Sequence, residues 1–269
     1  MGGALCRGII DAHIVEASKV VVSDIHADHV QSLQQTLGVR VAKGNEQLAK
    51  HCEVIVLALK PFTVASVLDE IRESLKRDEG KPLPLLISIA AGVRIETIQA
   101  HLDLPIPVVR AMPNTPALIG AGVTAAYAAT AVAPEETAQA GQVLSTMGKL
   151  LWVKSEALLD PVTAVSGSGP AYVFYFIEAL EQAARELGLE ADAARTLALE
   201  TFLGAARLAA GSSEDPATLR ARVTSKGGTT EAALALMDSS QLKPAIVRAV
   251  HAANARALEL GEQMGKDPA

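Results

Sequence analysis

Aromatic residues are scarce in this sequence of 269 residues, with one Trp, three Tyr and four Phe making up 3% of the chain. A core with so few large rings has to be built from Ala, Leu, Val and Ile, which supply most of the 49% of hydrophobic residues. Such side chains favour tight helix–helix contacts and parallel sheets that are covered on both faces. A β-sandwich is the less suitable architecture for this composition.

Cysteines, basic residues and long apolar runs are also few. Cys6 and Cys52 lie far apart without motif partners, so we expect a reduced, cytoplasmic protein without a structural disulfide. The net charge of −6 argues against nucleic acid or an anionic membrane as a partner. The uncharged stretches 117–133 and 161–177 are shorter than the roughly 20 apolar residues of a membrane span. We also expect no signal peptide.

The pattern of the chain changes near residue 154. Before it, short β-branched runs alternate with amphipathic helical segments, which predicts βαβ units and a parallel sheet. After it, only helical spacing remains, and Tyr172–Ile177 is apolar on every side, so we expect that segment to be buried in a subunit interface. The fold class is α/β, with a dinucleotide-type domain at 1–154 and an all-helical domain at 155–269. The predicted strands are 20–23, 54–59, 85–90, 108–111, 124–128 and 150–153.

The N-terminal start is unusual for a dinucleotide-binding domain. Such a domain normally opens with a strand, a Gly-rich turn and a helix whose N-terminus faces the pyrophosphate. Here Gly2 and Gly3 lead directly into an apolar helical pattern. Asp24 closes the next predicted strand, after Ser23, where a carboxylate can hydrogen-bond a ribose hydroxyl; a helix N-cap is its alternative role. The sequence therefore predicts a cofactor domain that lacks its first strand.

Two further strand ends carry residues that suit a ligand. Lys60 follows a predicted strand, and the carboxyl end of a parallel strand lies at the crevice where ligands bind. A solvated loop lysine is the alternative reading. The segment Ser88–Gly92 ends another strand in small residues, which lets a flat ligand approach the backbone, although ordinary close packing also produces such a pattern.

Two polar loops are more specific. The turn 110–116 (RAMPNTP) holds Asn114 between two prolines, which restricts the freedom of its polar side chains. The loop 222–231 (RVTSKGGTTE) surrounds Gly227 and Gly228 with four hydroxyl groups and then opens a helix. Free N–H groups and the dipole at a helix start favour an anion, so this loop predicts a carboxylate site.

The histidines do not indicate a metal site. His26 and His29 share one face of a predicted helix, but the pattern supplies no carboxylate or cysteine to complete a set of ligands. We therefore expect no bound metal.

Three long segments resemble the pyrroline-5-carboxylate reductases, which catalyse the last step of proline biosynthesis. They are 108–122 (VVRAMPNTPALIGAG), 160–180 (DPVTAVSGSGPAYVFYFIEAL) and 222–234 (RVTSKGGTTEAAL). The resemblance implies a Rossmann domain followed by a helical dimerisation domain. It implies hydride transfer from NADPH or NADH to the small molecule 1-pyrroline-5-carboxylate, giving L-proline. Dimers of this family often assemble further into decamers.

The resemblance and the residue patterns together indicate two sets of site residues. The substrate set has Thr230 and Ser225 as its catalytic candidates, with Thr230 hydrogen-bonding the ring nitrogen. Its members are Ser225, Gly227, Gly228, Thr229 and Thr230. The cofactor set is Gly2, Ser23, Asp24, Asn45, Leu59, Lys60, Pro61, Ala90, Ala91 and Asn114.

Two departures from the family leave alternatives open. Lys226 stands where many relatives have proline, and the first strand with its Gly-x-Gly turn is absent. A catalytically impaired oligomeric scaffold is therefore one alternative. A relative of the β-hydroxyacid dehydrogenases, which would need a catalytic lysine in the helical domain, is the other. The choice of cofactor also stays open, although Asp24 suits NADH because it would repel a 2′-phosphate.

Overall fold

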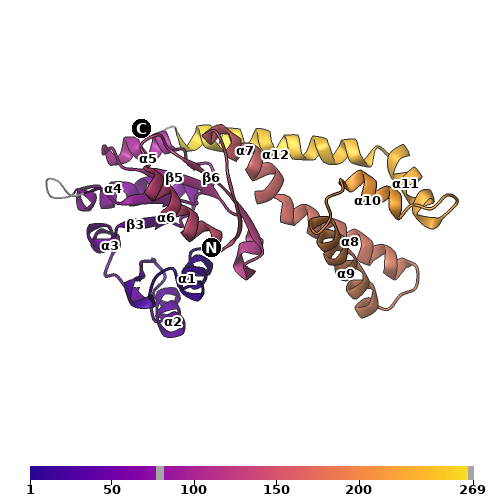
Figure 1. Ribbon diagram of the computed structural model, residues 1–269, viewed down its shortest axis with the longest axis horizontal. Coiled ribbons are helices and arrows are strands. Elements are labelled where there is room, and N and C mark those ends of the chain that lie inside the picture. Colours follow the sequence, from indigo (N-terminus) through magenta and orange to yellow (C-terminus); the bar gives the residue numbers. More distant parts are fainter. Residues whose placement is uncertain (77–81, 266–269) are drawn as a thin grey trace. The chain divides into compact units, whose positions relative to one another are not determined.

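The computed structural model describes residues 1–76 and 82–265 (Figure 1). Internal contacts divide the chain into two compact units, which are described separately below. Unit 1 comprises Met1–Ser168 together with the residues from Ala253 onward, and unit 2 comprises Gly169–Ala252. The domain boundary after residue 154 was predicted from a change of residue pattern and not from contacts, and it stays a prediction.

Unit 1 is an α/β unit that contains every strand of the described residues. The strands are β1 (Val21–Val22), β2 (Arg40–Val41), β3 (Val54–Leu57), β4 (Leu85–Ser88), β5 (Val108–Met112), β6 (Gly122–Ala128) and β7 (Gly148–Trp152). The α-helices before residue 169 are α1 (Gly2–Asp11), α2 (Ala27–Leu37), α3 (Asn45–His51), α4 (Val64–Leu75), α5 (Ile95–Leu102), α6 (Pro134–Ser145) and α7 (Leu159–Val162). The six predicted strands are confirmed, and β2 was not predicted because two residues carry no visible periodicity.

The strands form two sheets rather than one. β1 pairs with β2 in parallel, and a second sheet has the order β3-β4-β5-β6-β7. β6 runs antiparallel to β5, which differs from the all-parallel expectation. The connection 113–121 explains the difference, because a parallel crossover needs about a dozen residues or more.

The break between the two sheets falls where a Rossmann fold has its first strand. In that fold the opening strand lies between the strands equivalent to β1 and β3. No strand of the described residues joins them here. The topology therefore confirms the expected fold class, a Rossmann-like domain without its first strand.

Both faces of the larger sheet are buried at its central strands β4 and β5. Ile55 and Leu57 of β3 contribute to one core with α3, α4 and α5, while Leu85 and Ile87 of β4 contribute to the opposite core with α1 and α6. This alternation follows from the period of two along a strand. With both faces covered, polar side chains are expected where the strands end.

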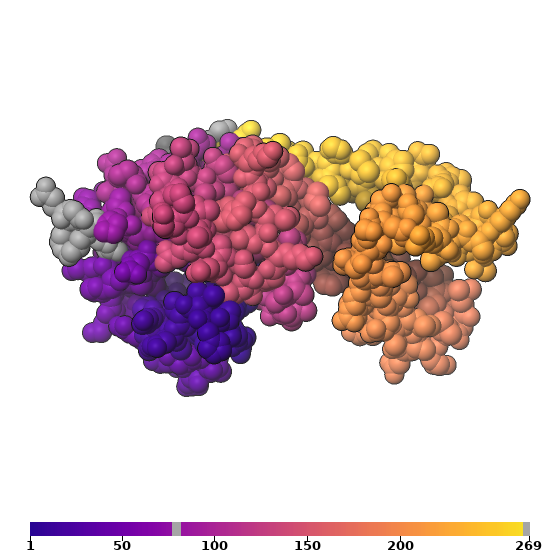
Figure 2. Space-filling view, in the orientation of Figure 1, coloured from indigo at the N-terminus to yellow at the C-terminus, as the bar shows by residue number. Residues whose placement is uncertain are grey.

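Helix α1 lies on the second face of the sheet, where its Leu5 is buried. It contacts α2 and α6. In the space-filling view, α1 and α2 form the indigo region of the unit (Figure 2).

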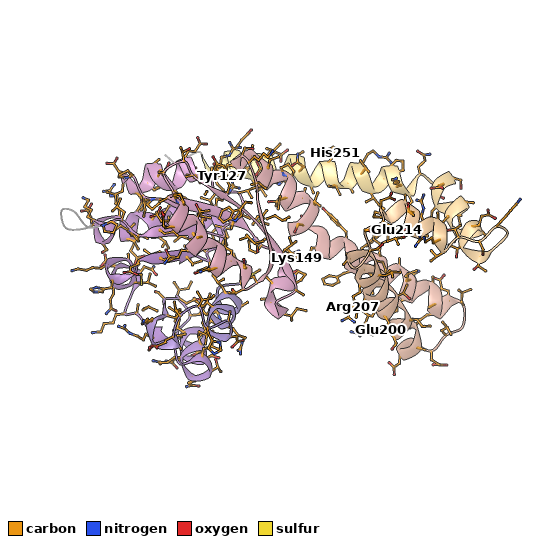
Figure 3. All side chains as sticks on the ribbon, in the orientation of Figure 1. Tyr127, Lys149, Glu200, Arg207, Glu214 and His251 are labelled. Carbon is orange, nitrogen blue, oxygen red and sulfur yellow. The ribbon has the colours of Figure 1, made fainter. Side chains whose placement is uncertain are left out.

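Unit 2 contains helices only. They are α8 (Gly169–Glu186), α9 (Ala191–Ala210), α10 (Pro216–Arg222), α11 (Thr229–Ser239) and the first part of α12 (Leu242–Met264). As predicted, Asp215 caps α10: its carboxylate accepts a hydrogen bond from the N–H of Thr218 at 2.9 Å. Glu214, beside that cap, pairs with Arg222 at the other end of α10 (Figure 3). No helix of the described residues is long and apolar enough to span a bilayer.

Unit 2 buries very little of its own surface. Ala194 and Ala198 are its only buried residues. Phe174 is 64% exposed and Tyr175 is 72% exposed. The single chain therefore does not bury Tyr172–Ile177 by itself, since the neighbouring helices cover only part of α8, and burial of this segment in a subunit interface stays a prediction.

The open edge of β3 is a testable feature of this fold. The carbonyl oxygens of Glu53 and Leu57 accept hydrogen bonds from the β4 side. Alternate residues of a strand direct their backbone groups to opposite sides, so Val54 and Val56 face the open edge. We expect their amides to exchange with deuterium roughly fivefold faster than those of Ile55 and Leu57, about the effect of one hydrogen bond. NMR-detected exchange measures the ratio, and equal protection would show that this edge has a partner.

Candidate functional site

The predicted cofactor residues all belong to unit 1, and most follow the ends of its strands. Gly2 begins α1 and Asn45 begins α3, whereas Ser23 and Asp24 follow β1. The others follow β3, β4 or β5; these are Leu59, Lys60, Pro61, Ala90, Ala91 and Asn114. Lys60 is exposed at its strand end.

Asp24 is oriented by two histidines of its own loop and the following helix. The backbone N–H of His26 donates to Oδ1 at 3.0 Å, and His29 Nδ1 lies 3.1 Å from Oδ2. Partial desolvation alone would raise the pKa of the Asp24 carboxyl, but the hydrogen bonds from His26 and His29 outweigh it, so the pKa lies below its usual value. The side chain is therefore a fixed anion at neutral pH.

The turn after β4 is narrow and lined by small residues. Ser88 is fully buried, and its Oγ lies 3.4 Å from the N–H of Ala90. Gly92 has a φ of +79°, a left-handed conformation that favours glycine. A crevice of about 90 Å³ lies beside this turn, and Pro61, Ala91, Gly92 and Asp160 are among its lining residues.

Two asparagines of the predicted set already have partners. Asn45 Nδ2 donates to Glu70 Oε2 at 2.9 Å on an exposed surface. Asn114 Oδ1 accepts from the N–H of Val123 at 3.0 Å, which ties the turn after β5 to β6. This bond gives Asn114 a structural role that the proline-bracketed turn did not reveal.

The predicted substrate residues lie close together in unit 2: Ser225, Gly227 and Gly228 in the loop between α10 and α11, and Thr229 and Thr230 at the start of α11. Gly227 has a φ of +74°, and its N–H donates to Glu231 Oε2 at 2.7 Å. The N–H of Gly228 donates to the carbonyl of Ser225 at 3.0 Å. A Cβ on Gly228 would lie 2.6 Å from Ser225 Oγ, so only glycine fits there without movement.

The start of α11 leaves backbone donors free. Thr229, Thr230 and Glu231 are its first residues, and a helix start gives their N–H groups no intrahelical acceptor. Gly228, the N-cap residue, supplies no side-chain cap. The donors available to an anion therefore include those of Thr229 and Thr230, whereas the N–H groups of Gly227 and Gly228 are already engaged.

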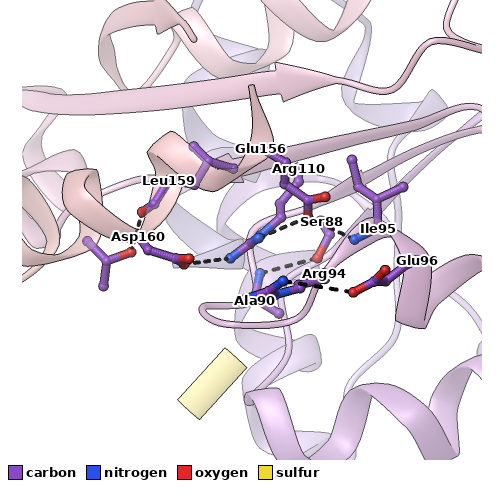
Figure 4. A network of polar contacts seen from close by, with 10 residues as sticks. Ser88, Ala90, Arg94, Ile95, Glu96, Arg110, Glu156, Leu159 and Asp160 are labelled. Atoms are coloured by element: carbon purple, nitrogen blue, oxygen red, sulfur yellow. Dashed lines mark hydrogen bonds and ion pairs between the residues drawn. The ribbon is translucent and has the colours of Figure 1, made fainter. Parts of the chain in front are cut away.

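A buried ionic network lies beneath the turn after β4 (Figure 4). Arg110 of β5 is only 4% exposed, and its Nη1 lies 2.9 Å from Glu156 Oε1. Its Nη2 lies 3.7 Å from Asp160 Oδ1, and Asp160 is also 4% exposed. Sequence reasoning missed this network, although a charged residue within the apolar run VVRAM was a signal for it.

The described residues offer no other obvious chemistry. They contain no group of three His, Cys, Asp or Glu side chains that would hold a metal ion. Burial raises the pKa of the Cys6 thiol, which lowers its thiolate fraction and hence its nucleophilicity.

Comparisons with known proteins identify the family. The family model for pyrroline-5-carboxylate reductase dimerisation matches residues 156–260, and a model described as NADP oxidoreductase, coenzyme F420-dependent, matches residues 1–92. A pyrroline-5-carboxylate reductase of Pseudomonas aeruginosa is 40% identical over 99% of this chain and 95% of its own length. The chain belongs to the pyrroline-5-carboxylate reductase family.

Solved structures of pyrroline-5-carboxylate reductases have the same fold. The Coxiella burnetii enzyme has a TM-score of 0.89 and 35% identity, covering 96% of this chain and 94% of that one. The Plasmodium falciparum enzyme, solved with NADP bound, has a TM-score of 0.84 and 30% identity, covering 97% and 94%. The resemblance drawn from three sequence segments is therefore confirmed.

Proposed function

We propose that this chain reduces 1-pyrroline-5-carboxylate to L-proline with NAD(P)H. The observation that carries the proposal is the similarity to pyrroline-5-carboxylate reductases over nearly the whole chain. The Gly-Gly-Thr-Thr loop and the strand-end residues supply the chemistry that this reaction needs. A cytoplasmic location is part of the proposal, since Cys6 and Cys52 form no disulfide.

The substrate carboxylate binds at the start of α11. The free N–H groups of Thr229 and Thr230 and the positive end of the helix dipole favour an anion there. The Ser225 hydroxyl, on the same loop, is a further donor. Gly227 and Gly228 shape the loop rather than bind through their own N–H groups, because those groups already have acceptors.

Thr230 also hydrogen-bonds the ring nitrogen of the substrate. Thr230 is partly buried, and it lies on the first turn of the same helix. Hydride acceptance at the imine carbon requires a protonated nitrogen, so an oxygen beside that nitrogen stabilises its positive charge. Positioning and electrostatics of this kind are what the protein adds to a cofactor reaction.

The strand ends of unit 1 fit a nicotinamide dinucleotide. Asp24 offers a fixed carboxylate to a ribose hydroxyl, and Ala90 and Ala91 leave room for a flat ring. A Cβ on Gly2 would lie 3.1 Å from Ala58 Cβ, so the start of α1 closely approaches the end of β3. When bound, the reduced cofactor supplies the hydride.

NADH is the proposed better donor. A carboxylate with a lowered pKa at the end of β1 would repel a 2′-phosphate and accept a hydrogen bond from a 2′-hydroxyl. One matching family model and one related structure are described with NADP. A preference of this chain for NADH would therefore depend on its own Asp24.

A homodimer formed through unit 2 is the proposed minimal assembly. A helical unit with two buried residues cannot stabilise itself through its own core. A hollow of about 930 Å³ between α8 and α9 is lined by the apolar side chains of Phe174, Ile177 and Leu199 together with charged and polar ones. A second copy covers this surface, and five such dimers can form a decamer.

The alternatives make different predictions. A silent scaffold would bind neither NADH nor substrate. The dehydrogenase alternative is not favoured, because the relatives that match nearly the whole chain are pyrroline-5-carboxylate reductases.

Replacing Thr230 by Val tests the catalytic assignment. We expect Thr230→Val to lower kcat/KM for 1-pyrroline-5-carboxylate by about tenfold or more, the loss of one hydrogen bond to a charged group. Thr36→Val, on the exposed face of α2, is the matched control and should leave the kinetics unchanged. Equal kinetics for the two variants would remove Thr230 from the site.

Replacing Asp24 by Asn tests the cofactor preference. Asn keeps an oxygen for the N–H of His26 but removes the negative charge. We expect the ratio of kcat/KM for NADPH to that for NADH to rise by roughly tenfold, the effect of removing one repulsive charge pair near the surface. Asp28→Asn, in the exposed first turn of α2, is the control. An unchanged ratio in Asp24→Asn would contradict the assignment.

Replacing Phe174 by Asp tests the dimer. A buried charge at an apolar interface strongly disfavours association, so we expect Phe174→Asp to sediment as a monomer of 28.0 kDa at concentrations where the wild type is a dimer or larger. Phe62→Asp, at an equally exposed phenylalanine of unit 1, should keep the wild-type mass. A dimeric Phe174→Asp protein would place the interface elsewhere.

A further inference from the structure

Arg110 is a charged residue in the interior of a mixed sheet. Its Cα neighbours are Ser88 on β4 and Tyr127 on β6, the latter labelled in Figure 3. It shares its face of β5 with Val108, which belongs to the core that α4 and α5 cover. A guanidinium in such a place requires compensating charges. Glu156 and Asp160 supply them, from the segment that follows β7.

Glu156 has a second contact that Arg110 does not require. Its Oε1 also accepts a hydrogen bond from the backbone N–H of Ile95 at 2.9 Å. Ile95 is the first residue of α5, whose N-cap Arg94 provides no side-chain cap. The carboxylate thus caps an otherwise free donor and lies at the positive end of the helix dipole. One oxygen atom therefore joins β5 to the start of α5.

The turn 89–94 is held by a hydrogen bond at each of its two ends. At one end, the N–H of Ile89 donates to the carbonyl of Leu57, which continues the pairing of β4 with β3. At the other end, Glu156 holds Ile95. Asp160, the second partner of Arg110, lines the crevice beside Ala91. One carboxylate of the network thus bonds to the residue that follows this turn, and the other lines the same crevice as Ala91.

We propose that Glu156, itself held by Arg110, is a positioning residue that fixes the Ala90–Ala91 turn for the nicotinamide cofactor. Glu156 does not touch the cofactor; it acts through the start of α5. The inference rests on the proposed function, because it takes this turn to be part of the cofactor site. It adds a residue from the segment 156–163 to the determinants of cofactor affinity.

The test compares Glu156→Gln with Glu96→Gln. Gln keeps the shape and an accepting oxygen but removes the charge that both contacts use. Glu96 is a matched control, because it lies in the same region and its 3.9 Å pair with Arg94 is exposed (Figure 4). Three kinds of measurement are made on the full chain: deuterium exchange of residues 89–96 without cofactor, the Kd for NADH by calorimetry, and steady-state kinetics that give the KM for NADH and the KM for 1-pyrroline-5-carboxylate.

We expect Glu156→Gln to speed exchange in residues 89–96 and to raise the Kd and KM for NADH, each by about tenfold, since charge-assisted hydrogen bonds are the stronger ones. The KM for 1-pyrroline-5-carboxylate should stay within about twofold of the wild type, because a positioning role at the cofactor turn leaves the loop at α11 unchanged. Glu96→Gln should match the wild type in all three. Equal results for the two variants would overturn the proposal, and so would an equal rise of both KM values.

A second variant keeps the test decisive if Glu156→Gln does not fold. Glu156→Asp retains the charge but shortens the side chain, so it can still neutralise Arg110 while losing its reach to Ile95. Fast exchange in residues 89–96 of a folded Glu156→Asp protein supports the proposal, and wild-type exchange with wild-type NADH affinity overturns it. If the wild type itself neither binds NADH nor reduces 1-pyrroline-5-carboxylate, the proposed function fails, whereas the exchange comparison still tests how the turn is held.

Discussion

Strands β4 and β5 are covered on both faces, and this constraint determines where unit 1 can place polar groups. Their side chains alternate between two apolar cores, so neither face can accept a solvated charge. Ligand-binding groups are therefore left to the strand ends, where Asp24, Lys60 and the Ala90–Ala91 turn lie. Arg110 is the exception, and its burial is tolerable because two carboxylates come to it from outside the sheet.

The same reasoning explains why the gap beside β3 matters. A strand that contributes to both cores normally has a hydrogen-bonded neighbour on each side, and within the described part of the chain β3 has one only on the β4 side. Helix α1 still packs on the sheet through Leu5, so the layer of helices on this face of the sheet is retained. The gap thus affects backbone pairing more than it affects the apolar core.

Local signals in the sequence were sufficient for most elements but not for contacts between distant segments. Continuous β-branched runs predicted β3 to β5, and Asp215 before a proline predicted the start of α10. The structural role of Asn114 could not be predicted, because its side chain accepts a hydrogen bond from Val123 of β6, and this contact depends on how β6 packs beside the turn. The pairing of Arg110 with Glu156 spans 46 residues and depends on the packing of the segment after β7, which no periodicity encodes. The assignments at Ser225 and Thr230 came from motif and resemblance, and they stay predictions.

The exposed surface of unit 2 has a consequence for how the chain matures. In the proposed dimer, part of the apolar burial of unit 2 comes from another chain, so a single copy does not complete its folding by a first-order process. Its final step is then an encounter between chains, whose rate rises with their concentration. Until that encounter, the apolar faces of α8 and α9 remain open to chaperones and to aggregation. The level of expression therefore sets how long each new chain stays vulnerable.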